Sequence, residues 1–246
     1  MPYLTRDAAS IYYEDHGRGF PMLLIAPGGM HSTVEMWSRA AIDPLEALRG
    51  DLRLVAMDQR NAGRSTGPLE VGDPWGSFAA DQLALMDHLD IEQFAVMGCC
   101  IGGSYALKLV DLAPERVAAA VLQQPIGIEA TNGHLFDAMW RGWAEQLGAT
   151  RPDLDPRTLE RFGTRMWDGD FVVSVTREAV RRSATPILVL PGVDQYHPTA
   201  TGREIAALAP RGELVEPWKG DAQQVAAATA AVRAFLRRHA ARRPTG

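Results

Sequence analysis

The stretch Phe94-Ala-Val-Met-Gly-Cys-Cys-Ile-Gly-Gly103 places Cys100 in the middle of a G-x-C-x-G sequence, where an apolar run ends and a helical pattern begins. This strand, sharp turn and helix form a nucleophile elbow, with sulfur in place of the usual serine oxygen. The glycines at 98 and 102 are needed because side chains there would collide with the neighbouring backbone, while the nucleophile itself takes strained backbone angles. We therefore expect the thiol of Cys100 to point out of the sheet.

The helix that starts with Ile101 adds to this prediction. A helix N-terminus carries unpaired N–H groups and the positive end of the macrodipole, which favour a thiolate and can bind a developing oxyanion. The sequence thus predicts a nucleophile, Cys100, and one oxyanion-hole donor, the N–H of Ile101. Cys99 precedes the tip and should pack against the sheet. The alternative for Cys100 is that it is a small buried hydrophobic residue, as many free cysteines are.

Composition bounds the class of protein. The chain has 246 residues, a net charge of -5 and a pI near 5.7, which gives no electrostatic case for nucleic acid or an anionic membrane surface. No apolar run is long enough to span a bilayer and the N-terminal residues lack signal-peptide features, so we expect a cytoplasmic protein with a small-molecule partner. The oligomeric state stays open, with a homodimer among the possibilities.

The cysteines and glycines also limit cofactors. The chain has 2 cysteines and they are adjacent, which excludes a disulfide framework and leaves no zinc ligand set. The glycines at 98, 102 and 103 follow a strand but do not form the G-x-G-x-x-G pattern of a dinucleotide loop. We expect no cofactor and no metal.

Along the chain, short apolar runs alternate with helical periodicity. Continuous apolar strands in such an alternation predict an α/β fold with a mostly parallel sheet covered by helices on both faces. The predicted strands are 10–14, 21–26, 52–58, 94–97, 117–123, 186–190 and 213–216, and the predicted helices are 77–89, 101–112, 201–208 and 222–239.

The alternation breaks over residues 126–183, a helical stretch rich in tryptophan and arginine. An insertion here would lie over the carboxyl ends of the strands, where open α/β sheets bind ligands. We therefore predict a small helical cap at 126–183 on a core formed by 1–125 and 184–246. Trp140 and Trp143 are candidate substrate-binding residues, and the alternative is that they only fill the core of the cap.

Beyond the elbow, three stretches carry a resemblance to the α/β-hydrolase superfamily: Leu24-Ile-Ala-Pro-Gly-Gly-Met30, Ala56-Met-Asp-Gln-Arg-Asn-Ala-Gly-Arg-Ser65 and Pro186-Ile-Leu-Val-Leu-Pro-Gly-Val-Asp194. The first resembles the loop that donates the second oxyanion-hole N–H, here from Gly29 or Met30. The second is similar to the family's D-x-R-G-x-G-x-S turn, with Asn61 in place of the first glycine. The third resembles the strand and loop that carry the triad acid, which implies that role for Asp194.

The resemblance departs from the family at the base. The family's histidine lies in the loop after the last strand, but here that loop reads Glu216-Pro-Trp-Lys-Gly-Asp-Ala222 and has none. His239 lies later, on the terminal helix, where we expect it at the surface. His197, in Asp194-Gln-Tyr-His-Pro198, is a candidate relocated base; the alternative is that it only hydrogen-bonds its own loop.

A thiolate needs less help than a serine alkoxide, so a cysteine at the elbow and a histidine outside its usual loop are chemically compatible. Lys219 could act as a base if it were desolvated, although an exposed lysine is the simpler expectation. His31 directly follows the predicted oxyanion loop and is a candidate substrate-binding residue.

These residues predict a cysteine-dependent hydrolase or acyltransferase that acts on an ester, thioester or lactone of a small, largely apolar molecule through an acyl-Cys100 intermediate. A different class also stays open: a lyase of the same fold, or a non-catalytic small-molecule-binding protein with a degenerate triad. The missing histidine favours the second class, whereas the retained elbow glycines favour the first.

Overall fold

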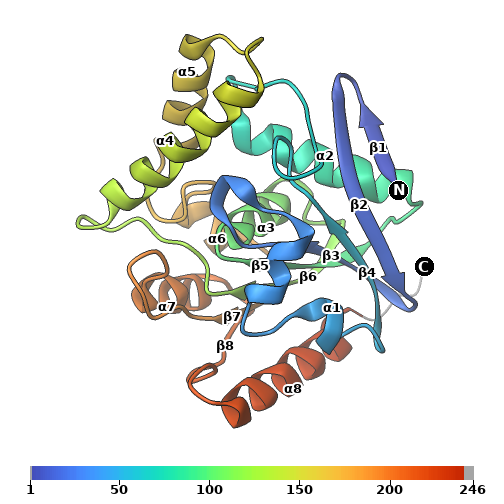
Figure 1. Ribbon diagram of the computed structural model, residues 1–246. Coiled ribbons are helices and arrows are strands. Elements are labelled where there is room, and N and C mark those ends of the chain that lie inside the picture. The colour runs from blue at the N-terminus through green and yellow to red at the C-terminus, as the bar shows by residue number, and fades with distance from the viewer. Residues whose placement is uncertain (1, 241–246) are drawn as a thin grey trace.

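A computed structural model of the protein describes residues 2–240, so residue 1 and residues 241–246, which end the predicted core, lie outside the described residues. An eight-stranded sheet runs through the centre in the order β1-β2-β4-β3-β5-β6-β7-β8 (Figure 1). β1 and β2 pair antiparallel with their neighbours and the rest of the sheet is parallel. The strands are β1 Tyr3–Arg6, β2 Ala9–Gly17, β3 Phe20–Ile25, β4 Leu52–Met57, β5 Phe94–Cys99, β6 Val117–Gln123, β7 Ile187–Leu190 and β8 Gly212–Leu214.

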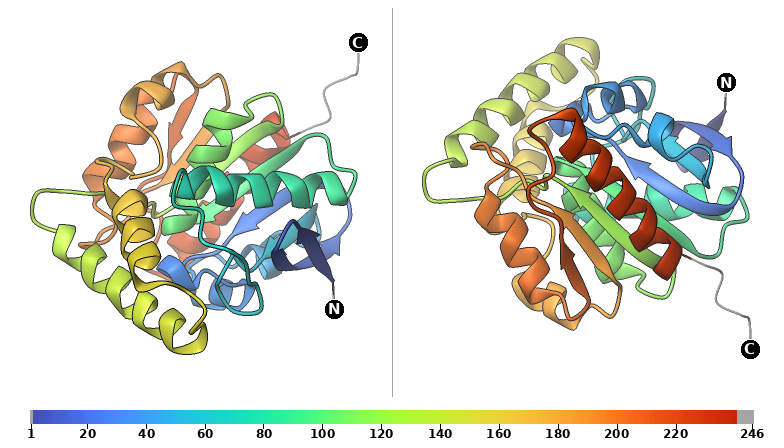
Figure 2. Two further views of the ribbon diagram at one scale, coloured as in Figure 1. Left: turned by 90° about the horizontal axis from the view of Figure 1, so that it is seen from above. Right: turned by 90° about the horizontal axis from the view of Figure 1, so that it is seen from below.

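Helices cover both faces of this sheet (Figure 2). α8 lies across one face, whereas α2 and α3 lie on the other, as the views from below and above show. The α-helices are α1 Pro44–Ala47, α2 Pro74–His88, α3 Ile101–Leu112, α4 Gly133–Thr150, α5 Pro156–Trp167, α6 Arg177–Arg182, α7 Thr199–Leu208 and α8 Ala222–His239; two short 3-10 helices are η1 Gly29–His31 and η2 Val34–Arg39.

The core has two parts because the central strands are buried on both faces. Every residue of β5 is buried, and its side chains alternate between a cluster with α2, α3 and the cap and a cluster with η2 and α8. Cys100 touches both clusters, since it directly follows the carboxyl end of β5. The site is therefore built on a strand whose residues are all buried, which limits its movement.

The predicted fold class is confirmed. The predicted strands and helices are present, with ends that differ by a few residues, and β1 is an additional short edge strand. Within residues 2–240, no helix is long and apolar enough to cross a membrane.

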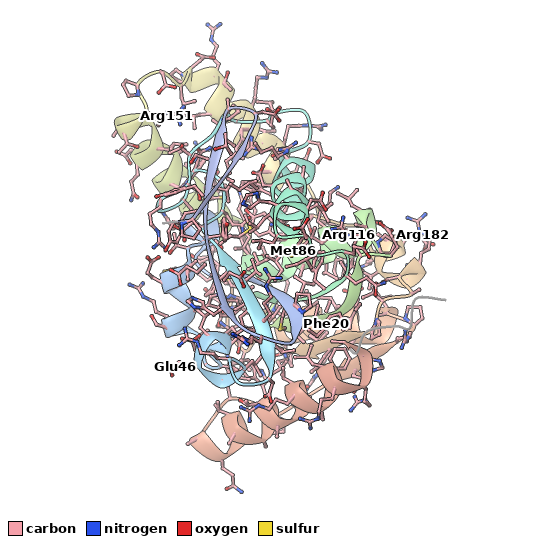
Figure 3. The ribbon with its side chains drawn as sticks, turned by 90° about the vertical axis from the view of Figure 1, so that its right-hand side faces the viewer. Phe20, Glu46, Met86, Arg116, Arg151 and Arg182 are labelled. Carbon is pink, nitrogen blue, oxygen red and sulfur yellow. The ribbon has the colours of Figure 1, made fainter. Side chains whose placement is uncertain are left out.

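The segment 126–183, which the sequence assigns to a cap, contains α4, α5 and α6. α4 packs on η1 and on α5, and α5 packs on α2, so these two helices lie over the loops at the carboxyl ends of the strands (Figure 1). α6 packs against α3 and α7 of the core. In Figure 3, Arg151 lies at the outer end of the cap, while Met86, a buried residue of α2, lies inside the molecule.

Candidate active site

The turn at Cys100 has the geometry that the sequence predicts for an elbow. Cys100 has φ 58° and ψ -121°, a strained combination for a residue with a side chain. A Cβ at Gly98 would collide with the carbonyl of Gly102, and a Cβ at Gly102 would collide with the carbonyl of Ile25. The N–H of Cys100 donates to the carbonyl of Gln123 at 3.0 Å, which ties the turn to the end of β6.

The thiol of Cys100 is poised to ionise. Burial by itself would raise its pKa, but the interaction with His197 and the N–H groups of Ile101 and Gly28 outweigh this, so the pKa of the Cys100 thiol lies below its ordinary value. Cys99 differs, because burial raises the pKa of its thiol far above the ordinary range. Cys100 keeps some exposed surface, whereas Cys99 is buried. The pKa values of the two adjacent thiols therefore shift in opposite directions, and the reactive role of Cys100 stays a prediction.

His197 reaches the thiol from the loop after β7. Its Nδ1 lies 2.7 Å from Oδ1 of Asp194, which leaves Nε2 as the outer nitrogen. Nε2 is buried and meets hydrogen-bond geometry with no group among the described residues. Even so, His197 and Cys100 lie close enough for each to shift the pKa of the other. Burial lowers the pKa of His197, but Cys100 and Asp194 raise it by more, so the pKa lies above its ordinary value.

Asp194 holds this arrangement through a compact turn. Its Oδ1 accepts from the backbone N–H of Tyr196 at 3.0 Å and of His197 at 3.1 Å, besides facing the imidazole. Burial raises the pKa of Asp194, yet His197 and these two N–H groups lower it by more, so the pKa of the carboxyl lies below its ordinary value. Both of the residues that the sequence marked in this loop, Asp194 and His197, are thus brought together with Cys100.

Asn132, at the start of the cap, fastens the same loop. Its buried side-chain amide donates to the carbonyl of Gln195 at 2.8 Å and to the carbonyl of Gly127 at 2.8 Å. The ring of Phe136 packs edge-on against Tyr196, with the ring centroids 5.5 Å apart. The cap therefore sets the position of the histidine loop, a role for Asn132 that the sequence does not reveal.

The loop after β3 faces the thiol from the other side. The N–H of Gly28 acts on the thiol together with that of Ile101, and Gly28 was not among the predicted donors. Gly29 and Met30 follow it in η1, where a Cβ on Gly29 would collide with Met139 of α4. The cap thus packs directly on this loop, and the oxyanion roles of Gly29 and Met30 stay predictions.

The turn at Asp58–Ser65 supports the loop from below. The buried carboxylate of Asp58 accepts from the N–H of Val34 at 2.8 Å and from Nε of Arg64 at 2.8 Å. The N–H of Gln59 donates to the carbonyl of Ser32 at 2.9 Å, so the turn holds the segment that follows η1. Asn61 takes φ 61° at the position where the family turn has glycine, and asparagine tolerates such angles better than most residues.

The remaining predicted residues lie around this centre. Trp140 and Trp143 are buried and stack with Phe162 between α4 and α5, so the structure places both in the core of the cap, and a contact with substrate stays a prediction. His31 is exposed at the end of η1, and its pocket role likewise stays a prediction. Lys219 is half-buried and donates to Gln124.

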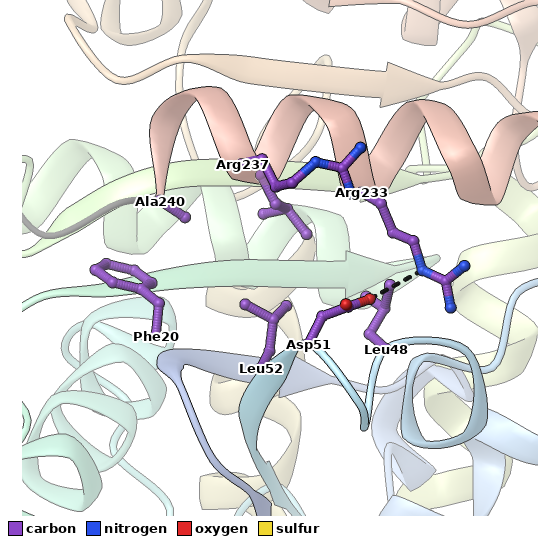
Figure 4. A pocket seen from close by; sticks show the side chains of 8 residues that line it. Phe20, Leu48, Asp51, Leu52, Arg233, Arg237 and Ala240 are labelled. Atoms are coloured by element: carbon purple, nitrogen blue, oxygen red, sulfur yellow. Dashed lines mark ion pairs between the residues drawn. The ribbon is translucent and has the colours of Figure 1, made fainter.

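A well-formed pocket lies far from this centre (Figure 4). It is lined by residues at the starts of β3 and β4, Phe20 and Leu52, and by residues of α8, with an ion pair of 3.0 Å between Arg233 and Asp51. Cys100 follows the carboxyl end of β5, which runs parallel to β3. The pocket lies at the amino ends of β3 and β4 and therefore at the opposite end of the strands. It has no part in the chemistry of the thiol.

The family is shown by comparison with known proteins. The family model described as alpha/beta hydrolase fold matches residues 21–203, and the chain therefore belongs to the alpha/beta hydrolase fold family. This match confirms the family that the elbow, the loop after β3 and the turn at Asp58–Ser65 indicate.

Individual relatives are more distant. The chain is similar to a putative carbamate hydrolase of Azorhizobium caulinodans, with 33% identity over 50% of this chain and 43% of that protein. It is also 31% identical to a 2-hydroxymuconate semialdehyde hydrolase of Pseudomonas sp. CF600, over 60% of this chain and 50% of that protein. The matched part thus spans about half the length of these curated relatives or less.

Solved structures extend the likeness in fold to nearly the whole chain. A meta-cleavage product hydrolase from Pseudomonas fluorescens IP01 matches with a TM-score of 0.69 and 20% identity, over 94% of this chain and 95% of that one. An enol-lactonase from Burkholderia xenovorans LB400 matches with a TM-score of 0.69 and 20% identity, over 96% of this chain and all (100%) of that one. At this identity the likeness concerns the fold alone.

Proposed function

We propose that the protein is a cysteine-dependent hydrolase or acyltransferase that forms an acyl-Cys100 intermediate from an ester, thioester or lactone. The observation that carries this proposal is the line of groups from Asp194 through His197 to the thiol: Nδ1 of His197 lies 2.7 Å from Oδ1 of Asp194, and the imidazole lowers the pKa of the Cys100 thiol. The hydrolase names of the curated relatives support an activity of this class.

The chemical steps follow from these positions. The thiolate of Cys100 attacks the carbonyl carbon, and the N–H groups of Ile101 and Gly28 stabilise the oxyanion as the carbon–sulfur bond forms. The carbonyl is restored when the bond to the leaving group breaks, and that group takes its proton from protonated His197. Water, or an acceptor alcohol, amine or thiol, then loses a proton to His197 and attacks the thioester; the carbon–sulfur bond breaks, the acyl group leaves on the acceptor, and the thiolate of Cys100 and protonated His197 are restored.

Asp194 makes the histidine suitable for both steps. Its carboxylate accepts a hydrogen bond from Nδ1–H and thereby leaves Nε2 to exchange the proton. The pKa of His197 is raised and that of Cys100 is lowered, and both changes favour the pair of thiolate and imidazolium over the neutral pair. This is the state that attacks a carbonyl without a separate deprotonation step.

The substrate is a small molecule with an apolar part. Aromatic rings extend from the histidine loop into the cap: Tyr196 packs on Phe136, which packs on Trp167 at 5.5 Å between ring centroids, and Trp167 packs on Trp75. Such a wall suits an apolar acyl group or leaving group.

The test is brief exposure to p-nitrophenyl acetate near neutral pH, followed by peptide mapping by mass spectrometry and measurement of released nitrophenol. An acetyl group on the peptide at Cys100 with continuing release supports hydrolysis, and an adduct that builds up and releases only when a thiol or amine is added supports acyl transfer. Cys99→Ala is the matched control and should keep the adduct, whereas Cys100→Ala should lose it. A panel of ester, thioester and lactone substrates that leaves Cys100 unmodified would refute the covalent mechanism and favour the lyase or binding class.

A further inference from the structure

The loop between β8 and α8 brings the ammonium group of Lys219 to the carboxyl ends of the central strands, where Cys100 also lies. Nζ of Lys219 donates to the side-chain carbonyl Oε1 of Gln124 at 2.6 Å, although the two residues are 95 positions apart. Gln124 directly follows β6, and β6 is the neighbour of β5, which ends at Cys99. Lys219 thus lies in the loop where the family places its histidine, and it reaches back to the strand beside the elbow.

Both partners of this contact are held firmly. The N–H of Gln124 donates to the carbonyl of Leu190 at 2.6 Å, and Gln124 takes φ 40°, an angle that a residue with a side chain adopts only when its surroundings impose it. On the other side, the buried Trp218 donates from Nε1 to the carbonyl of Pro191 at 2.6 Å. Nζ of Lys219 lies 5.5 Å from the centre of the Trp218 ring. The ammonium group is therefore placed in advance of any ligand.

The charge of Lys219 is not neutralised by the protein. Among residues 2–240 no carboxylate lies within ion-pair distance of Nζ: Glu216 pairs with Arg203 at 2.8 Å, and Asp221 accepts from the N–H of Gln224 at 2.8 Å to cap α8. An ammonium has three N–H donors, and Gln124 takes one of them through a neutral oxygen. The others remain for an anion at this edge.

The charge is also felt at the elbow. Although burial raises the pKa of Cys99, the positive charge of Lys219 acts in the opposite direction on the same thiol. An ammonium group that acts on Cys99 and has donors to spare suits a carboxylate, because charge-assisted hydrogen bonds are about twice as strong as neutral ones.

We propose that Lys219, positioned by Gln124, forms a carboxylate-binding subsite beside Cys100, so that the preferred acyl group has an apolar chain and ends in a carboxylate. This inference rests on the proposed function for the acyl group but not for the subsite itself. Glutarate, a five-carbon dicarboxylate, is a suitable probe because it has a carboxylate at each end of a short apolar chain.

The first experiment measures binding without turnover. Cys100 is alkylated with iodoacetamide in the presence of glutarate or of its neutral diamide, in the wild-type protein, Lys219→Met, Lys219→Arg and the matched control Lys108→Met. Lys108 lies on α3, so Lys108→Met removes the same charge at a position away from the elbow. Glutarate should protect the wild type, Lys219→Arg and Lys108→Met, and the concentration needed should rise about ten-fold or more in Lys219→Met. Equal protection in Lys219→Met, or protection of the wild type by the diamide alone, would overturn the subsite.

The second experiment compares p-nitrophenyl hydrogen glutarate with p-nitrophenyl valerate, which has the same chain length and no charge. Lys219→Met should lower kcat/KM for the glutarate ester about ten-fold or more through KM, while the value for the valerate ester changes by less than about two-fold. An equal fall for both esters would assign Lys219 a merely structural role and overturn the proposal. If neither these esters nor the panel of esters, thioesters and lactones acylates Cys100 in the wild type, the proposed function fails, and the glutarate protection still decides on the subsite.

Discussion

Replacing His197 with alanine should raise the pH at which Cys100 becomes reactive. In the wild type the thiol pKa lies below its ordinary value because interaction with His197 and two N–H groups outweighs burial. Without the imidazole, burial is opposed only by the N–H groups of Ile101 and Gly28, so the pKa rises. An interaction with a charged partner contributes about 1.5–3 kcal/mol, which corresponds to a thiolate population about 10- to 150-fold smaller at a pH below both pKa values.

The assay is the rate of modification of Cys100 by iodoacetamide between about pH 5 and pH 10, followed by peptide mapping. The rate follows the thiolate, which is present above its pKa, so the wild-type curve should rise at lower pH than the curve of His197→Ala. Cys99→Ala should follow the wild-type curve, since the Cys99 thiol is buried and its pKa is raised. Coincident curves for the wild type and a folded His197→Ala would refute the ion pair and with it the relocated base.

Three further outcomes test the support around this pair. Asp194→Asn should move the same curve upward by less than His197→Ala, because the amide oxygen still accepts from the backbone while the charge is lost. Asn132→Ala removes two hydrogen bonds that Asn132 donates to the carbonyls of Gly127 and Gln195. Ester turnover should fall by about ten-fold or more, and the free energy of unfolding in urea should fall by about 1–3 kcal/mol. Unchanged turnover would contradict the role of Asn132 in positioning the histidine loop. Asp81→Asn leaves the buried guanidinium of Arg60 without its carboxylate and should lower the free energy of unfolding in urea by about 3–5 kcal/mol. The pH curve of Cys100 in the folded variant should match that of the wild type. A smaller loss of stability would contradict the dependence of Arg60 on the Asp81 carboxylate.

The fold could be predicted because the informative patterns are local. Strands buried on both faces appear as apolar runs, and β5 ends in glycine and cysteine where the elbow begins. β1 was not predicted, since it has 4 residues at the edge of the sheet and only its second and fourth are buried or half-buried. α1 is equally short and gives no helical period. Short elements at the surface carry too few residues for a pattern.

The centre of the site was also accessible from local sequence. The angles at Cys100 follow from the neighbouring glycines, and Ile101 must start the helix. Asp194 and His197 lie three positions apart in one loop, so their contact needs no knowledge of the rest of the fold. Whether His197 reaches the thiol depends on how the loops after β5 and β7 converge, which one sequence leaves open.

The parts that were missed depend on contacts between distant segments. Asn132 meets Gln195 across 63 positions, and Lys219 meets Gln124 across 95. Gly28 differs, since the loop was identified but the N–H that faces the thiol is set by how η1 packs under the cap. No periodicity or motif encodes such pairs, because each partner alone is an ordinary polar residue in a loop.

Placing the acid and the base in one loop changes what the other loops can do. The carboxylate of Asp194 and the ring of His197 are connected by a turn of four residues, so their 2.7 Å contact does not depend on a second loop. A Cβ on Gly192 would collide with His197, which means that this turn also fixes how the imidazole leaves the sheet. The loop after β8 is thereby released from carrying the base. It holds Lys219 against Gln124 instead, and we propose that this side chain recognises the substrate while Cys100 and His197 carry the chemistry.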